Sequence, residues 1–88
     1  MNDIDNLKML TCEDVANIFH VHKNQVNIWR EMGILKGIRT GRNIMYSKME
    51  IQAFQERFLG YDISNRTRIK ETLEQMKIHH DNERNLDK

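Results

Sequence analysis

The amino-acid sequence predicts a mainly α fold with one small β-hairpin and an additional helix at its C-terminal end. Apolar residues recur at helical spacing over residues 11–19, 23–32 and 47–59, and more weakly after residue 61. Between the second and third of these segments, apolar residues instead alternate from one position to the next near a glycine. Such alternation beside a glycine turn is typical of a β-hairpin. Because the chain has no proline, its four glycines supply most of the signals that end elements.

The first predicted helix begins after Thr11 and ends at Phe19. Thr11 suits the N-cap position, and Glu13 and Asp14 follow in the first turn, where the helix dipole favours negative charge. The apolar face of this helix comprises Val15, Ala16 and Phe19. The next three residues, His20-Val21-His22, are too few for anything but a turn.

The second predicted helix runs from Lys23 to Met32. Its apolar face comprises Val26, Trp29 and Met32. Gly33 follows at once and suits the left-handed position just past a helix end. At this spacing Trp29 is expected in the core rather than stacked on a base. Ile28 lies off the apolar face and could pack against the wing or the C-terminal segment, or stay partly exposed.

A hairpin and a third helix are predicted next. The hairpin covers residues 38–46, with its turn near Gly41. Ser47 and Glu50 have the spacing of a capping box, with Ser at the N-cap and Glu three residues later. The helix that they open is expected to end at Gly60. Its apolar stripe comprises Ile51, Phe54 and Phe58.

The two ends of the chain differ from this central part. Residues 1–9 are predicted to be flexible, residues 10–60 to form the domain, and residues 61–88 to form a C-terminal helix with a polar tail. A thin apolar stripe on that helix is predicted to mediate self-association or to dock a partner, and consists of Ile69, Leu73 and Met76. The alternative for this segment is a phosphate contact through its basic residues, Arg66, Arg68 and Lys70.

The net charge of +1 conceals an uneven distribution along the 88 residues. Residues 1–19 carry one Lys and four acidic side chains, giving −3, and residues 49–88 carry seven basic and eight acidic side chains, giving −1. Residues 20–48 carry six Lys or Arg and one Glu, giving +5. This local basic excess favours an anionic partner such as nucleic acid more than the total charge suggests.

Two short helices joined by a tight turn and followed by a hairpin form a winged helix-turn-helix. There the second helix enters the major groove of DNA, and the hairpin, or wing, reaches the backbone or the minor groove. Asn and Gln pair with adenine edges, and Lys contacts guanine or phosphate. The residues expected to contact double-stranded DNA are Lys23, Asn24, Gln25, Asn27, Arg30, Arg39, Thr40, Arg42, Asn43 and Lys48. Arg30 could equally serve only to solvate the flank of its helix.

Other kinds of site lack a supporting pattern. Cys12, His20 and His22 match no zinc-binding spacing, so no metal or cofactor is expected. The sequence has no glycine-rich phosphate loop and no nucleophile motif, so an enzyme is not expected. The single cysteine, the acidic N-terminus and the lack of a long apolar run favour a cytoplasmic protein with no membrane contact.

A longer pattern of residues runs through positions 10–59. It comprises Leu10-Thr11, Val15-Ala16, Val21-His22, Val26, Trp29-Arg30, Gly33-Ile34-Leu35, Gly41-Arg42, Tyr46-Ser47, Glu50-Ile51 and Phe54. This pattern resembles the winged helix-turn-helix of the excisionase and MerR-like superfamily. It departs from the family at His22, where a Ser or Thr usually caps the second helix. It also departs at Asn27-Ile28, where MerR-type regulators often have Arg then Tyr.

The resemblance implies sequence-specific binding to double-stranded DNA. It places the helix of residues 23–32 in the major groove and the wing of residues 38–46 on the backbone or minor groove. Excisionases bind beside recombination sites and bend DNA for an integrase, and similar compact proteins regulate mobile elements. The alternative is a protein-assembly module, similar to a phage terminase small subunit or a recombinase partner, that uses the helix of residues 62–88.

Overall fold

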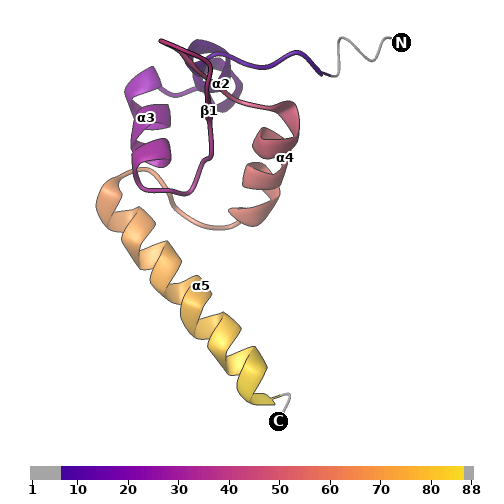
Figure 1. The fold of residues 1–88 in the computed structure, drawn as a ribbon. Helices are drawn as coiled ribbons and strands as arrows, with labels where there is room; N and C mark the ends of the chain where they lie inside the picture. The colour runs from indigo at the N-terminus through magenta and orange to yellow at the C-terminus, as the bar shows by residue number, and fades with distance from the viewer. Residues whose placement is uncertain (1–6, 87–88) are drawn as a thin grey trace.

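The computed structural model describes the backbone of residues 7–86 and the side chains of residues 7–77, and it confirms the mainly α fold with a hairpin (Figure 1). Its elements are α2 (Cys12–Phe19), α3 (Lys23–Glu31), β1 (Ile38–Arg39), β2 (Ile44–Met45), α4 (Lys48–Arg57) and α5 (Arg66–Leu86). Most of the N-terminal segment predicted to be flexible, residues 1–6, lies outside the described residues. No helix in the described part of the chain is both long and apolar enough to cross a membrane.

The predicted helix starts are present, although one capping residue has a different role. Thr11 and Asp14 form a complete capping box, since each backbone N–H donates to the other's side chain at 3.0 Å. The Ser47 hydroxyl accepts from the Glu50 N–H at 3.0 Å, as the sequence predicts. The Glu50 carboxylate does not return this bond; it accepts from the backbone N–H of Lys36 at 3.0 Å. Glu50 therefore ties the start of α4 to the segment that leads into the hairpin.

Aromatic rings from three helices form the centre of the core. The Trp29 ring of α3 lies 5.1 Å from the Phe19 ring of α2 and 5.0 Å from the Phe54 ring of α4, measured between centroids. The Phe54 ring is also 5.1 Å from the Phe58 ring at the end of α4. Edge-to-face and tilted packing of this kind adds to the free energy gained by burial. Trp29 is therefore a core residue, as its spacing predicts.

The hairpin is short, and it is joined to the helices through its base. Its strands pair antiparallel, with Ile38 opposite Met45 and Arg39 opposite Ile44. Beyond the hairpin, Tyr46 pairs with Leu10 through backbone hydrogen bonds of 2.7 and 2.8 Å. The segment just before α2 thus extends the hairpin, a long-range contact that the sequence pattern did not reveal.

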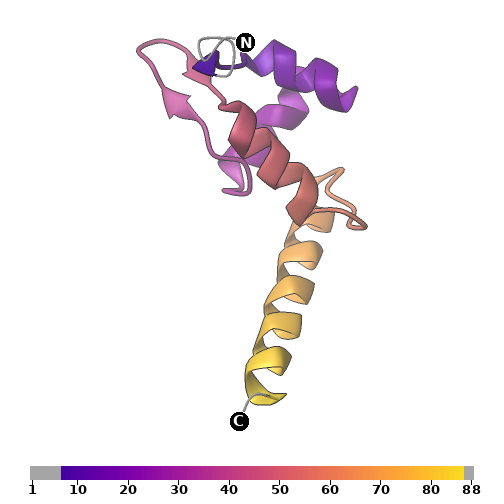
Figure 2. The ribbon, with the colours of Figure 1, turned by 90° about the vertical axis from the view of Figure 1, so that its right-hand side faces the viewer.

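The C-terminal helix begins inside the domain and then leaves it. Ile69 is fully buried in the same core as Trp29, and Met76 packs against that core. The Thr72 hydroxyl donates to the Asp62 carbonyl at 3.1 Å. The rest of α5 runs away from the helical body (Figures 1 and 2). The predicted domain limit at residue 60 therefore excludes a helix whose first turns complete the core.

The predicted self-association stripe needs a correction for the same reason. Ile69 is 0% exposed within a single chain, so the prediction that it mediates self-association is wrong. Met76 is half-buried against the core, while Leu73 keeps 37% of its surface exposed. The stripe serves mainly to anchor α5, and Leu73 is its exposed member.

Gly37 lies where the backbone before β1 passes close to β2. A Cβ atom at this position would meet the Cγ2 of Ile44 and would lie 3.0 Å from the Cε1 of Tyr46. Because the Ile44 methyl is fixed to a β-branched carbon in the strand, the hairpin itself must shift to make room. Gly37→Ala is therefore expected to lower the free energy of unfolding by about 1–3 kcal/mol, measured by denaturant titration.

A double-mutant cycle provides the control for this prediction. Ile44→Ala removes the methyl group that meets the new Cβ, so the double variant should be more stable than the sum of the two single changes implies. Strict additivity of the two losses would show that the close approach is not the cause.

Candidate nucleic-acid interface

The starts of α2 and α3 and the tip of the hairpin surround an open cleft of about 460 Å³. Four of the residues predicted to contact DNA line this cleft, namely Lys23, Asn27, Arg42 and Asn43. The first two lie on α3 and the other two in the hairpin turn, 15 or more positions later in the sequence. The fold therefore brings the two predicted contact regions to one side of the molecule.

The cleft also contains residues that sequence reasoning did not select. Thr11, Cys12 and Glu13 come from the start of α2, and Tyr46 comes from the base of the hairpin. Helical periodicity finds the buried face of α2, but it does not show which end of α2 lies beside α3. That depends on how the two helices cross, which only the folded chain determines.

The first turn of α3 is held by an unusual cap. His22, the residue that departs from the family pattern, takes the N-cap position, and its Nδ1 atom accepts from the Asn24 N–H at 3.1 Å. A histidine nitrogen here does the work of the usual serine or threonine oxygen. Lys23 and Asn24 follow with exposed side chains, but only Lys23 lines the cleft, because Asn24 lies at the edge of a separate hollow next to Gln25. The departure at His22 therefore preserves the start of this helix.

Asn27 lies deeper in the cleft than Lys23. Its Oδ1 atom is 3.8 Å from the Sγ atom of Cys12, which is also 3.7 Å from the Lys23 carbonyl. These are weak thiol hydrogen bonds. Of the Asn27 amide they involve only the oxygen, so the amide nitrogen can still donate a hydrogen bond to an acceptor on a molecule bound in the cleft.

The wing carries its polar residues on an exposed turn. The Thr40 N–H donates to the Asn43 carbonyl at 2.9 Å, and the Thr40 hydroxyl lies 3.4 Å from the same oxygen. Thr40 thus closes the turn, while Arg39, Arg42 and Asn43 are exposed. Lys48 is exposed at the first position of α4, next to the base of the hairpin. The wing therefore presents cations on a constrained loop.

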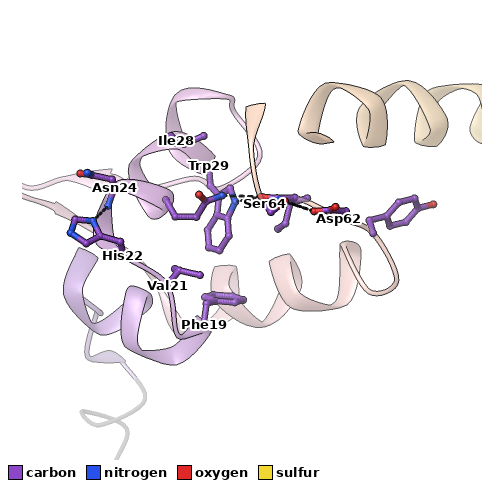
Figure 3. Close-up of a pocket in the computed structure, with 11 residues that line it drawn as sticks. Phe19, Val21, His22, Asn24, Ile28, Trp29, Asp62 and Ser64 are labelled. Carbon is purple, nitrogen blue, oxygen red and sulfur yellow. Dashed lines mark hydrogen bonds between the residues drawn. The ribbon is translucent and has the colours of Figure 1, made fainter. Parts of the chain in front are cut away.

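Gln25 does not take the position that the sequence predicts. Its side-chain amide donates to the Ile63 carbonyl at 2.9 Å, and the indole N–H of Trp29 donates to the same oxygen at 2.9 Å. Figure 3 shows this region, where Trp29 and Phe19 face the segment around Asp62. Gln25 is half-buried on the side of α3 next to the segment that leads into α5. Gln25 is therefore held within the chain and is not expected to read bases.

The segment that accepts these bonds is itself well ordered by local contacts. The Ser64 hydroxyl and N–H donate to the Asp62 carboxylate at 2.6 and 3.0 Å, which lowers the pKa of Asp62. Ile28, which the sequence left unassigned, lines a hollow of about 650 Å³ between α3 and this segment.

Arg66 at the start of α5 forms an ion pair with Glu31 at the end of α3, with 2.6 Å between the Arg66 Nη2 and Glu31 Oε1 atoms. Arg66 is therefore already neutralised within the chain.

Arg30 is partly withdrawn toward the wing. It is half-buried, and its Nε atom and the hydroxyl of Tyr46 are both buried with no hydrogen-bond partner among the described residues. Burial raises the pKa of Tyr46, and the nearby positive charge of Arg30 offsets part of that rise. Arg30 therefore lies in the seam between α3 and the hairpin, unlike the exposed Lys23 and Arg42.

Cys12 is a thiol inside the cleft, and burial raises its pKa above the usual value despite the positive charge of Lys23. Less of it is therefore thiolate at a given pH, and the thiolate is the reactive form. Alkylation of Cys12 by iodoacetamide near pH 8 is expected to be slower than in the urea-unfolded chain. Its rate should also reach half of its plateau at a higher pH, followed by mass spectrometry. Equal midpoints in the folded and unfolded chains would contradict this assignment.

Comparison with known proteins adds one finding to this geometry. A family model described as a helix-turn-helix domain matches residues 9–58, which is more than half of the chain and covers α2, α3, the hairpin and α4. No curated protein and no solved structure matches the sequence.

Proposed function

The chain belongs to the helix-turn-helix domain family, and from that premise we propose that it binds specific sequences in double-stranded DNA through the cleft between α3 and the wing. The observation that carries this proposal is the shared cleft of Lys23 and Asn27 with Arg42 and Asn43. In this proposal the protein acts by binding DNA, with no catalytic step and no cofactor.

The first part of α3 is the recognition helix. An α-helix fits the major groove, and its N-terminal residues are the ones that reach base edges in this class of motif. Asn24 and Asn27 contribute amide groups of the kind that pair with adenine, while Lys23 contacts guanine or a phosphate. Gln25 and Trp29 hold the opposite side of the helix to the chain.

The wing provides contacts that do not depend on sequence. Arg39 ends β1 and Arg42 lies in the turn that Thr40 closes, and both are exposed, so their charges can reach phosphate oxygens without rearrangement of the backbone. Phosphate contacts of this type fix orientation and register. Lys48 extends the same basic surface to the start of α4.

Within this function, we assign the chain to the excisionase-like architectural factors or to the regulators of mobile elements. The support is the residue pattern of positions 10–59, together with a wing that follows the recognition helix directly. Selection of bound sequences from a random duplex pool, followed by footprinting, distinguishes the two. Direct repeats with DNA bending favour an architectural role, and a single site over a promoter favours regulation.

Salt dependence and two sets of substitutions test the DNA interface. If four cations each neutralise one phosphate, log K should fall against log salt with a slope of about −3.6. Asn24→Ala with Asn27→Ala should reduce discrimination between the selected and random sequences by about 1–3 kcal/mol per lost base contact. Arg42→Ala should weaken binding to all duplexes alike and make the slope shallower by about 0.9.

Lys77→Ala is the matched control for the DNA interface, because it removes one exposed cation from α5, which runs away from the body that carries the wing (Figure 2). It should leave both affinity and slope close to those of the wild type. Salt-insensitive binding, or no duplex binding at low salt, would reject the proposal.

A second candidate function is protein assembly through α5, and one observation favours it. α5 extends away from the body, and on it Leu73 is exposed and lines a shallow hollow. A partner, either a second copy or a recombinase-like protein, would cover Leu73 there.

Sedimentation tests this candidate with a matched pair of variants. Leu73→Glu is expected to reduce any self-associated species to monomer, because it places a charge at the centre of the contact. Gln75→Glu adds the same charge at an exposed neighbouring position and should leave the mass unchanged. Equal effects of the two changes would contradict assembly through Leu73. Point substitutions are preferred to truncation of the C-terminal segment, because Ile69 of α5 belongs to the core.

A further inference from the structure

Glu13 places a negative charge in the cleft proposed to meet DNA. It is the second residue of α2, and it is the sole carboxylate among the described residues that line the cleft. Its Oε2 atom lies 3.8 Å from the Nζ atom of Lys23, and the two side chains are 75% and 56% exposed. A carboxylate at a phosphate-binding surface opposes binding to DNA in general, so its position calls for an explanation.

Stability of the fold explains this position only in part. The helix dipole favours a carboxylate in the first turn of α2, but only weakly at so exposed a side chain. The N-terminus of α2 is already capped by the reciprocal bonds of Thr11 and Asp14. An ion pair as exposed as that of Glu13 with Lys23 contributes little to folding. The Glu13 carboxylate therefore adds little to the stability of the fold, and it can serve the interface.

We propose that Glu13 is a specificity-determining residue of the DNA interface. On a duplex of arbitrary sequence, Glu13 keeps its ion pair with Lys23 and repels the nearest phosphate. Lys23 of the recognition helix then makes no contact with the DNA backbone. On the cognate sequence, the Glu13 carboxylate accepts a hydrogen bond from a cytosine amino group in the major groove, which releases Lys23 to DNA. This inference rests on the proposed DNA-binding function.

The proposal fits the charge arrangement of the cleft. Lys23 lines the cleft from α3 and Arg42 lines it from the hairpin turn, and Asn27 and Asn43 add neutral amides to the same lining. A surface of cations and amides alone would bind any duplex through its phosphates. A single carboxylate beside Lys23 lowers this non-specific affinity. The reduction is largest for duplexes that place no hydrogen-bond donor, such as a cytosine amino group, near Glu13.

Charge-neutral variants of Glu13 test the proposal with a matched control. Glu13→Gln should tighten binding to a labelled random-sequence duplex by about fivefold at physiological salt, because Lys23 gains one phosphate. The slope of log K against log salt should steepen by about 0.9 for the same reason. Glu56→Gln removes the same charge from an exposed position on α4 and should leave the slope unchanged. Fluorescence anisotropy across a salt series measures all of these values.

A selection experiment tests the base contact separately. Sites selected with the wild type should contain a cytosine preference that Glu13→Gln loses and Glu13→Asp, which keeps the charge, partly retains. Identical salt slopes for Glu13→Gln and Glu56→Gln, or an unchanged cytosine preference in Glu13→Gln, would overturn the role of Glu13 while leaving DNA binding intact. Failure of the wild type to bind any duplex at low salt would overturn both.

Discussion

The packing of Trp29 is the interaction on which the other elements depend. Its ring contacts Phe19 of α2 and Phe54 of α4, and its indole N–H donates to the Ile63 carbonyl just before α5. One side chain of α3 thus positions both neighbouring helices and the start of the last one. Because the outer face of α3 is the one proposed to meet DNA, the inner face must be held in place. Trp29 does this with one side chain, through the contacts of its ring and the hydrogen bond of its indole N–H.

Much of the fold could be predicted from the sequence, because its signals are local. Thr11, Ser47 and Gly33 mark helix ends, and Gly33 has the positive φ of 82° expected past α3. Helical spacing likewise identified Trp29 as core. Each of these inferences needs only residues within about one turn of one another, and that is the range over which capping and periodicity act.

The parts that could not be predicted depend on contacts between distant segments. Gln25 and Ile69 have the spacing of a recognition residue and a surface stripe, but the fold uses both internally, through the Ile63 carbonyl and the core. Glu13 entered the site only because the start of α2 crosses close to α3. Overall charge was equally uninformative, since acidic and basic side chains of different segments meet in the one cleft. The sequence pattern thus identified α3 and the wing as parts of the site. Which residues of other segments line the site beside them depends on the fold.

The Ile63 carbonyl has a consequence for movement. A single oxygen accepts from both Gln25 and Trp29, one turn apart on α3, and the chain enters α5 three residues later. Rotation of α3 about its own axis would break one or both bonds, and so would a change in the direction of α5. These two bonds, with the ion pair of Arg66 and Glu31, tie the segment that leads into α5 to α3. A force that displaces the start of α5 would therefore act first on α3, through the Ile63 carbonyl.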